Sequence, residues 1–332
     1  MSKTIFITGA NGFLGSRITR LALKNKYRVK AFVRNTTNLD DINDKNLEFC
    51  FGDLRDKSSI EKSLTKVDFI FHVAADYRLW SKKKSEIYES NVFGTENLLK
   101  AACEVDHKKI IFTSSVATLG YEEGKISDES TKVNILDMKG HYKKSKYIAE
   151  RIFQEYIEKS KINGIIVNPS TPIGPGDFKP TPTGRIILKM LKKDFPGYVE
   201  TGLNFVHVDD VAIGHFLALN KGKIGEKYIL GGENVDFKDF LDRISEFAKV
   251  PKVKIKLNRY PLFPLAYFNQ LIALLFKSYE PMLTIESLKM SERKMFFSSE
   301  KAKKLLGYRP RNINSAIKES IESLHKKFIL VN

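Results

Sequence analysis

The chain has 332 residues, of which 42% are hydrophobic and 29% charged, which is the composition of a globular protein with a sizeable core. The net charge is +17, but the lysines are scattered in short runs without interleaved aromatic residues, so we predict no nucleic-acid partner. The sequence carries no signal-peptide pattern and no apolar run of about 18 residues, so we expect a cytoplasmic protein without a transmembrane helix.

The first fifteen residues join a β-branched strand to a glycine-rich turn. The strand, residues 4–8, leads into Gly9, Gly12 and Gly15, and apolar residues at helical spacing follow. Glycines at these positions allow a tight turn, close approach of the backbone to a pyrophosphate, and packing of the helix on the strand. The helix N-terminus would face the phosphate charge. The pattern predicts a dinucleotide site that includes Gly9, Asn11, Gly12, Phe13, Leu14 and Gly15.

Strand and helix patterns alternate through the first half of the chain. We expect strands at 4–8, 28–33, 47–51, 69–73, 110–114 and 165–168, with helical patterns at 87–104 and 142–159. This alternation predicts an α/β fold with a doubly wound parallel sheet, in which ligands bind beyond the carboxyl ends of the strands.

A long loop rich in proline and glycine begins at Pro169, and loops of this kind are usually functional. We expect helices near 184–192 and 209–220, a strand at 227–230, and further helices after it. Residues 1–169 are therefore assigned to a dinucleotide-binding domain. Residues 170–332 are assigned mainly to a smaller substrate-binding lobe, with some segments returning to the first domain.

The two cysteines, Cys50 and Cys103, stand far apart beside apolar or small residues. They form neither a metal-ligand spacing nor a C-x-x-C pair, so we predict buried free thiols in a reducing compartment and no metal site.

Residues that directly follow the expected strands are candidates for cofactor contacts. Arg34 follows the second strand and suits a ribose 2′-phosphate, which favours NADP and leaves NAD as the alternative. Asp53 and Leu54 follow the third strand, where the carboxylate would accept from the adenine amino group and the leucine would pack on the ring. Asp53 could instead cap a helix. After the fourth strand, small Ala74 and Ala75 let a ligand approach.

His72, in the fourth strand, is expected to be a packed histidine rather than a catalytic group.

Tyr142 and Lys146 lie four residues apart, hence on one helical face, where a lysine cation lowers the pKa of a tyrosine. A serine after the fifth strand, Ser115 or else Ser114, would bind the substrate oxygen. Asn91 would either hold a water molecule of a proton relay or bond to backbone.

Taken together, these elements resemble the extended short-chain dehydrogenase/reductases, also called the NAD-dependent epimerase/dehydratase family. The resemblance implies a Rossmann sheet with a smaller substrate-binding lobe and a catalytic set of Ser115, Tyr142 and Lys146, with Asn91 as a further candidate. Ser115 is chosen over Ser114 from its distance to Gly120. Leu119 stands where the family has a tyrosine, which speaks against a standard nucleotide-sugar epimerase. The resemblance extends the cofactor site to Thr113, Tyr142, Lys146 and Pro169.

Four segments, 72–80, 168–177, 179–185 and 201–210, are similar to the hopanoid-associated sugar epimerases, which neighbour the NADPH-using dihydroflavonol 4-reductases. This resemblance implies an NAD(P)-dependent oxidoreductase or epimerase that transfers hydride at a hydroxyl or carbonyl carbon of a sugar-like or lipid-linked substrate. A dihydroflavonol-reductase-like carbonyl reductase and a non-catalytic dinucleotide-binding scaffold or sensor stay open as alternatives. The expected substrate contacts are Asp76, Tyr77, Ser115, Thr183 and Arg185.

Residues 262–276 form an apolar stretch that is too short to span a bilayer. We favour a helix packed against the substrate lobe. The alternative is a lid or membrane-facing helix that admits a lipid-like substrate and makes peripheral membrane contact, which would also suit the basic charge. A homodimer is left open.

Overall fold

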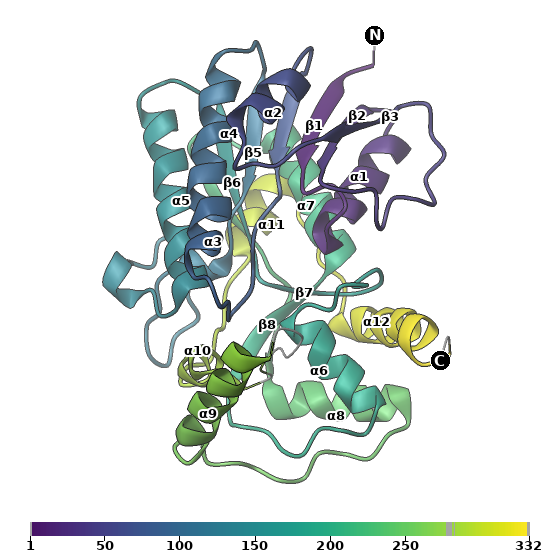
Figure 1. The fold of residues 1–332 in the computed structure, drawn as a ribbon, viewed down its shortest axis with the longest axis vertical. Helices are drawn as coiled ribbons and strands as arrows, with labels where there is room; N and C mark the ends of the chain where they lie inside the picture. Colours follow the sequence, from purple (N-terminus) through teal and green to yellow (C-terminus); the bar gives the residue numbers. More distant parts are fainter. Residues whose placement is uncertain (1, 277–280, 282, 331–332) are drawn as a thin grey trace.

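Seven parallel strands form the main sheet of the computed structural model, which describes residues 2–276, 281 and 283–330 (Figure 1). Their order is β3-β2-β1-β4-β5-β6-β9, so the chain builds the sheet outward on either side of β1. The bounds are β1 Thr4–Thr8, β2 Arg28–Val33, β3 Leu47–Phe51, β4 Phe69–His72, β5 Lys109–Thr113, β6 Gly164–Pro169 and β9 Lys227–Leu230. The predicted α/β class is confirmed.

Helices cover both faces of this sheet because the strand side chains alternate between two buried clusters. Ile5 and Ile7 of β1 belong to one cluster and Phe6 to the other. The first cluster lies under α1 (Phe13–Lys24), α7 (Val208–Lys221) and α11 (Glu300–Leu306), and the second under α2 (Lys57–Ser63), α4 (Gly94–Cys103) and α5 (His141–Glu158). The strand β9 and the helices α7 and α11 thus lie with the large sheet, although they follow residue 170. The domain boundary there stays a prediction.

The expected strands and helices of the first half agree with the structure to within one or two residues at most ends, with one exception in type. The helical pattern at 87–104 is a continuous helix in three parts: α3 (Ser85–Tyr88), a π-helical segment (Glu89–Phe93) and α4. A π-helical segment inserts an extra residue into the helical turn and is often found at functional sites.

A second, three-stranded sheet, which sequence analysis did not predict, organises the lower lobe in Figure 1. Its order is β10-β8-β7, formed by Glu233–Asp236, Gly202–His207 and Thr171–Ile173. The strand β7 is only three residues long and has a proline at its centre, so it lacks a strand signature. The helices α6 (Pro182–Leu191), α8 (Phe237–Ala248) and α12 (Ile313–Phe328) pack around this sheet through a third buried cluster.

The apolar stretch at 262–276 forms helix α9 (Leu262–Leu275), which leans on α10 (Ile285–Met290). We preferred a helix packed against the substrate lobe, and this prediction is wrong for most of the surface of α9. The buried residues of α9 are two small ones, Ala266 and Ala273. Phe268, for example, is 62% exposed. One stripe of contact cannot cover a helix that is apolar on all sides.

The cysteine prediction is half right. Cys50 is buried in the main sheet, whereas Cys103 is exposed. Cys103 is the last residue of α4, and its small neighbours Ala101 and Ala102 are buried residues of that helix whereas Cys103 is not. Among the described helices, none is long and apolar enough to cross a membrane.

Candidate active site

The glycine-rich turn between β1 and α1 has backbone geometry that larger residues could not adopt. Gly9 has a φ of +65°, and a Cβ there would lie 2.7 Å from the Cα of Ala74. A Cβ on Gly15 would lie 1.9 Å from the carbonyl oxygen of Gly9. Gly12 precedes α1 and offers no side chain to cap it, so the helix N-terminus stays open to an anion. These residues fit the pyrophosphate of a dinucleotide. Two further candidate contacts are half-buried at the start of α1: Phe13 and Leu14.

Amide side chains tie this turn to the loop that follows β2. The Nδ2 of Asn11 donates to the backbone carbonyl and to the Oδ1 of Asn35, both at 2.9 Å, and the Nδ2 of Asn38 donates to the carbonyl of Asn11 at 2.9 Å. Arg34 precedes this loop at the carboxyl end of β2 and is exposed. The backbone at Arg34 is therefore next to a loop that is bonded to the glycine-rich turn, and its side chain is exposed.

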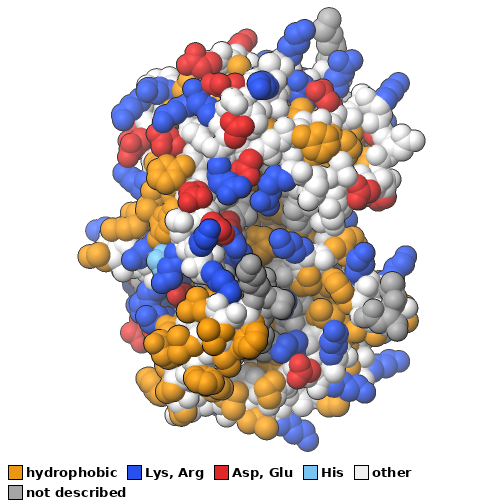
Figure 2. Space-filling model, viewed as in Figure 1, with side chains coloured by type: hydrophobic (Ala, Val, Ile, Leu, Met, Phe, Trp, Pro, Cys, Tyr) orange, Lys and Arg blue, Asp and Glu red, His pale blue; other side chains and the backbone are white. Residues whose placement is uncertain are grey.

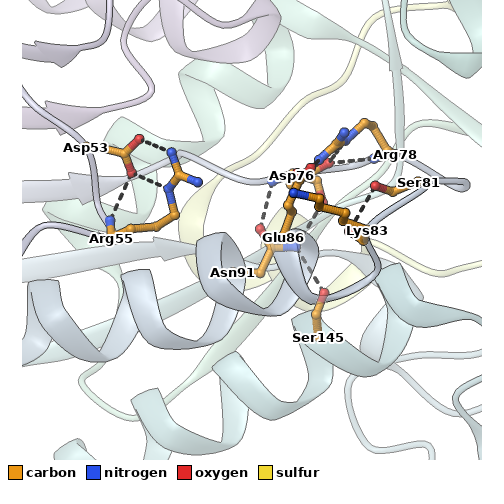
Figure 3. A network of polar contacts seen from close by, with 9 residues as sticks. All are labelled: Asp53, Arg55, Asp76, Arg78, Ser81, Lys83, Glu86, Asn91 and Ser145. Carbon is orange, nitrogen blue, oxygen red and sulfur yellow. Dashed lines mark hydrogen bonds and ion pairs between the residues drawn. The ribbon is translucent and has the colours of Figure 1, made fainter. Parts of the chain in front are cut away.

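Asp53, after β3, pairs with Arg55 (Figure 3). Its Oδ1 accepts from the backbone nitrogen of Arg55 at 2.9 Å, and its Oδ2 lies 2.7 Å from the Nη2 of that guanidinium. The hydrogen bond with Arg55 lowers the pKa of Asp53, and the charge of Arg34 acts in the same direction. The cap of α2 is Asp56, not Asp53. Sequence analysis missed Arg55, which brings a second guanidinium to this edge of the sheet; its place two residues after Asp53 was the available signal.

His72, in β4, is fully enclosed. Its Nδ1 lies 2.8 Å from the hydroxyl of Thr8 and its Nε2 lies 2.9 Å from the hydroxyl of Thr95. Burial lowers the pKa of His72 to about 3, with a smaller contribution from the charge of Lys146, so the ring is neutral at physiological pH. This is the packed histidine expected from the sequence. The following residues, Ala74 and Ala75, are half-buried at the strand end.

Asn91, in the π-helical segment, clamps the loop after β4 to the start of α5 (Figure 3). Its Oδ1 accepts from the backbone nitrogen of Asp76 at 2.7 Å, and its Nδ2 donates to the carbonyl of Asp76 at 2.8 Å and to the hydroxyl of Ser145 at 3.0 Å. The carboxylate of Asp76 pairs with Arg78, which also contacts Glu86. Of the two roles considered for Asn91, this geometry corresponds to backbone bonding.

Ser115, Tyr142 and Lys146 converge at the carboxyl end of β5. The Nζ of Lys146 donates to the carbonyl of Thr113, the last residue of β5, at 2.8 Å. Burial lowers the pKa of Lys146 to about 8. Burial raises the pKa of Tyr142, and a hydrogen bond with the side chain of Ser115 acts in the opposite direction. Lys146 therefore contacts the end of β5, and Tyr142 contacts Ser115, two residues after the end of that strand.

Ser114 has a different environment from Ser115. Its hydroxyl donates to the Oε2 of Glu150, a carboxylate buried to 3% exposure. The same carboxylate binds three other side chains: Thr118 at 2.8 Å, Asn168 at 3.1 Å, and Lys227 as an ion pair. Sequence analysis missed Glu150, although it continues the four-residue spacing of Tyr142 and Lys146 along α5. Ser114 is thus engaged inside the core, whereas the hydroxyl of Ser115 accepts from the backbone nitrogen of Ala117 at 3.1 Å and lies within hydrogen-bonding reach of Tyr142.

The loop that leads into α6 is shaped by Asp177. Its carboxylate accepts from the backbone nitrogen of Thr181 at 3.0 Å and from the hydroxyl of Thr181 at 2.7 Å. Burial raises the pKa of Asp177 to about 6, and the charge of Arg185 acts against this rise. Thr183 is buried in the first turn of α6. Thr183 and Arg185 both belong to α6, a helix of the lower lobe.

Two other candidate residues mark the boundary between the lobes. Tyr77 is partly exposed after β4, and its hydroxyl donates to the carbonyl of Lys179 at 3.4 Å. Pro169 ends β6, where it pairs with Leu230 of β9. These contacts join the loop after β4 and the edge of the main sheet to the segment that begins the lower lobe.

Within the described residues, His207, Asp209 and Glu319 bring potential metal-ligand atoms within 4.8 Å of one another. Two of the three side chains already have other partners. The Nδ1 of His207 accepts from the backbone nitrogen of Asp209 at 3.0 Å, which leaves the ring proton on Nε2, 3.2 Å from the carboxylate of Glu319. Asp209 forms two hydrogen bonds with Arg17 of α1. This cluster therefore ties α1, α7 and α12 together, and the arrangement does not fit a metal centre.

Comparisons with known proteins show the family of the chain. The model of the NAD-dependent epimerase/dehydratase family matches residues 5–231. A Synechocystis protein named for dihydroflavonol 4-reductase is 37% identical over 330 residues, which cover 97% of this chain and 94% of that protein. Sterol demethylase protein B of Methylococcus capsulatus is 26% identical and the match covers 96% and 97% of the two chains.

Two solved structures share the whole fold. The crystal structure of gox2253 is 45% identical, with a TM-score of 0.87 and coverage of 98% of this chain and 99% of that chain. UDP-glucuronic acid 4-epimerase of Bacillus cereus, solved in complex with NAD, is 21% identical, with a TM-score of 0.80 and coverage of 98% and 100%, which shows the fold alone. The chain belongs to the NAD-dependent epimerase/dehydratase family and is an NAD(P)-dependent enzyme of the short-chain dehydrogenase/reductase type.

Proposed function

We propose that the chain transfers hydride between NADP(H) and a hydroxyl or carbonyl carbon of an apolar, lipid-like substrate. The observation that carries this proposal is that Lys146 contacts the carboxyl end of β5 while Tyr142 contacts Ser115 just after that strand. The glycine-rich turn follows the carboxyl end of β1 in the same parallel sheet. The nicotinamide ring, when bound, supplies or accepts the hydride.

Tyr142 transfers the proton that accompanies the hydride. Because burial raises its pKa, the phenol is protonated at neutral pH, which suits donation to the oxygen of a carbonyl being reduced. Ser115 binds that oxygen and orients it toward Tyr142. Lys146, one helical turn away on the same face, is mainly charged at neutral pH with a pKa of about 8, and its charge stabilises the phenolate that remains. The same three residues work in the opposite direction in oxidation.

Two arginines support the phosphate-bearing cofactor. Arg34 is exposed at the end of β2, and Arg55 lies beside Asp53 at the end of β3. Since Arg55 already neutralises Asp53, the charge of Arg34 is left for a 2′-phosphate. We expect Arg34→Ala to weaken NADPH binding about tenfold or more and to leave NADH binding nearly unchanged, as measured by nucleotide fluorescence. Arg28→Ala, at the opposite end of the same strand, is the matched control. A wild-type preference for NADH would contradict the cofactor assignment.

Several features favour a ring-bearing or lipid-like substrate over a nucleotide sugar. Two relatives are named for a dihydroflavonol and a sterol, which are ring compounds with a hydroxyl group. Leu119, at the position of the tyrosine expected in standard nucleotide-sugar epimerases, is buried and apolar. The alternative is an epimerase on a sugar-like or lipid-linked substrate, in which the hydride returns to the substrate and no cofactor is consumed.

The test is to follow NADPH absorbance while apolar carbonyl compounds are screened with the purified protein. Tyr142→Phe should lower kcat by roughly 10²–10⁴-fold while NADPH still binds. Tyr156→Phe is the matched control, because Tyr156 lies about 21 Å from Tyr142 along the axis of α5. Inversion of a substrate centre without loss of NADPH would identify the epimerase. Full activity of Tyr142→Phe would contradict the proposed proton transfer, and no turnover with any substrate would favour the dinucleotide-binding scaffold or sensor.

A further inference from the structure

Helix α9 presents an apolar surface to solvent. Phe268 is 62% exposed, Leu265 55% and Leu274 52%, whereas the buried residues of the helix are two alanines. We call this surface the α9 patch; its members are Tyr260, Leu265, Tyr267, Phe268, Leu271, Leu274, Leu275 and Phe276. Figure 2 shows hydrophobic side chains gathered over α9 in the lower part of the molecule. Contiguous exposed apolar surfaces of this kind mark interaction sites.

Positive charges lie at one end of α9 and in the segment that precedes it. Residues 247–276 contain five Lys or Arg and no Asp or Glu. Lys252 and Lys254 are exposed in the segment that leads into α9. At the other end of the helix, the Nζ of Lys82 donates to the carbonyl of Leu274 at 2.8 Å, and Lys82 is the first of three consecutive exposed lysines. An apolar helix with a cationic rim is complementary to a bilayer with anionic headgroups.

This charge distribution decides between two occupants. A second copy of the chain would bring two cationic rims together, and each copy carries a net charge of +17, so self-association through the patch would be opposed by repulsion. An anionic bilayer accepts the same apolar side chains and attracts the same lysines. We infer that the α9 patch docks the enzyme on an anionic lipid surface, with α9 lying in the interface and Lys82, Lys252 and Lys254 at the headgroups.

The docking helix is linked to the catalytic helix through α10. The Nε2 of Gln270 on α9 donates to the carboxylate of Glu286 on α10 at 3.0 Å. The Cγ of Glu286 lies 3.2 Å from where a Cβ on Gly140 would be, and Gly140 is the residue that precedes α5. A docked enzyme would thus hold the start of α5, where Tyr142 lies, near the bilayer. This part of the inference rests on the proposed function and assigns a membrane-embedded alcohol or ketone as the substrate class.

The test is flotation of the full chain with vesicles of phosphatidylcholine alone and with vesicles that also contain phosphatidylglycerol. We expect binding to the anionic vesicles only, and weaker binding as salt is raised. Leu265→Ser combined with Leu274→Ser should reduce vesicle binding about tenfold or more. Ile224→Ser combined with Leu305→Ser is the matched control, since these side chains are 49% and 51% exposed elsewhere.

A second pair of variants tests the rim. Lys252→Gln and Lys254→Gln should each weaken binding to anionic vesicles about fivefold. Lys45→Gln and Lys62→Gln, exposed in the β2–β3 loop and on α2, should leave it unchanged. The inference is overturned if the wild type binds neither vesicle, if the patch variants bind as the wild type does, or if sedimentation shows a dimer that the patch variants dissociate.

The docking inference and the proposed function can be contradicted independently of each other. Turnover of a water-soluble carbonyl compound should be the same in wild type and in the patch variants, whereas turnover of a vesicle-embedded substrate should fall with vesicle binding. Vesicle binding without any hydride transfer would remove the proposed function and keep the docking surface. Hydride transfer without vesicle binding would remove the docking surface and keep the proposed function.

Discussion

The helices α5 and α9 differ in opposite ways from an ordinary amphipathic helix: α5 buries charged side chains and α9 exposes apolar ones. The helix α5 buries two charged side chains, Lys146 and Glu150, and each has partners: a backbone carbonyl for the lysine, and an ion pair with Lys227 and hydroxyl groups for the carboxylate. The helix α9 exposes Phe268 and the large apolar side chains around it. A buried charge needs partners to be tolerated, and the core supplies them. The fold does not need large apolar side chains at exposed positions, so their presence on α9 indicates a function of that surface.

The comparison predicts its largest effect at Phe153 on the buried side of α5. Phe153 is fully buried, and its ring stacks on that of Phe112 with centroids 4.8 Å apart. Phe153→Ala should lower the free energy of unfolding by about 3–5 kcal/mol, because it removes apolar contacts and leaves a cavity. Urea unfolding followed by circular dichroism measures this change. A loss below about 1 kcal/mol would mean that α5 is not held by this contact.

The next effect concerns the buried carboxylate of α5. Glu150→Gln removes the charge that pairs with Lys227 and one acceptor of the hydrogen-bond network. We expect a loss of about 2–3 kcal/mol in the free energy of unfolding, less than for a fully buried pair because the side chain of Lys227 is 22% exposed. Glu155→Gln, on the exposed side of the same helix, should change stability by less than about 0.5 kcal/mol. Equal effects of the two substitutions would break the comparison.

A smaller, pH-dependent effect is expected at Asp177. Burial raises its pKa from the ordinary 3.8 to about 6, so between these values the folded chain binds more protons than the unfolded chain. The wild type therefore loses stability as pH rises from about 4 to about 6, whereas Asp177→Asn does not titrate. The stability of Asp177→Asn relative to wild type should rise through this window by at most about 3 kcal/mol. Unfolding at several pH values checks this, with the exposed Asp40→Asn as the control. A difference that is flat with pH would show that the carboxyl titrates normally.

The smallest effect on folding is expected in the α9 patch. Phe268→Ala should change the free energy of unfolding by less than about 0.5 kcal/mol, because the ring is 62% exposed and leaves no cavity. The same urea titration serves for Phe268 and Phe153. If Phe268→Ala cost as much as Phe153→Ala, the patch would be part of the fold rather than a surface free to bind a partner.

Local patterns were enough to predict the main sheet. The spacing of Gly9, Gly12 and Gly15 and the alternation of apolar strands with helices are properties of short segments, and so is the helical spacing of Tyr142 and Lys146. The structure has these elements within a residue or two of the expected bounds.

Features that depend on distant segments could not be predicted. The strand β7 becomes a strand only through pairing with β8, about thirty residues later, and its own three residues give no signal. The partner of Glu150, Lys227, lies in β9, 77 residues further along the chain. Whether Cys103 and the large side chains of α9 are buried depends on which other segments pack against them. An apolar sequence shows that a side chain could be buried, but it does not show that a neighbouring segment covers it.

The two thiols give the chain a natural labelling site. Burial raises the pKa of Cys50 to about 11, which keeps that thiol unreactive, whereas Cys103 is exposed at the end of α4. Because α4 returns the chain to the start of β5, Cys103 lies at the edge of the main sheet opposite the catalytic residues. A maleimide fluorophore would therefore attach at one known point without any engineered cysteine, remote from α9, and quenching by lipid-borne acceptors would report how far that point stands from a bilayer.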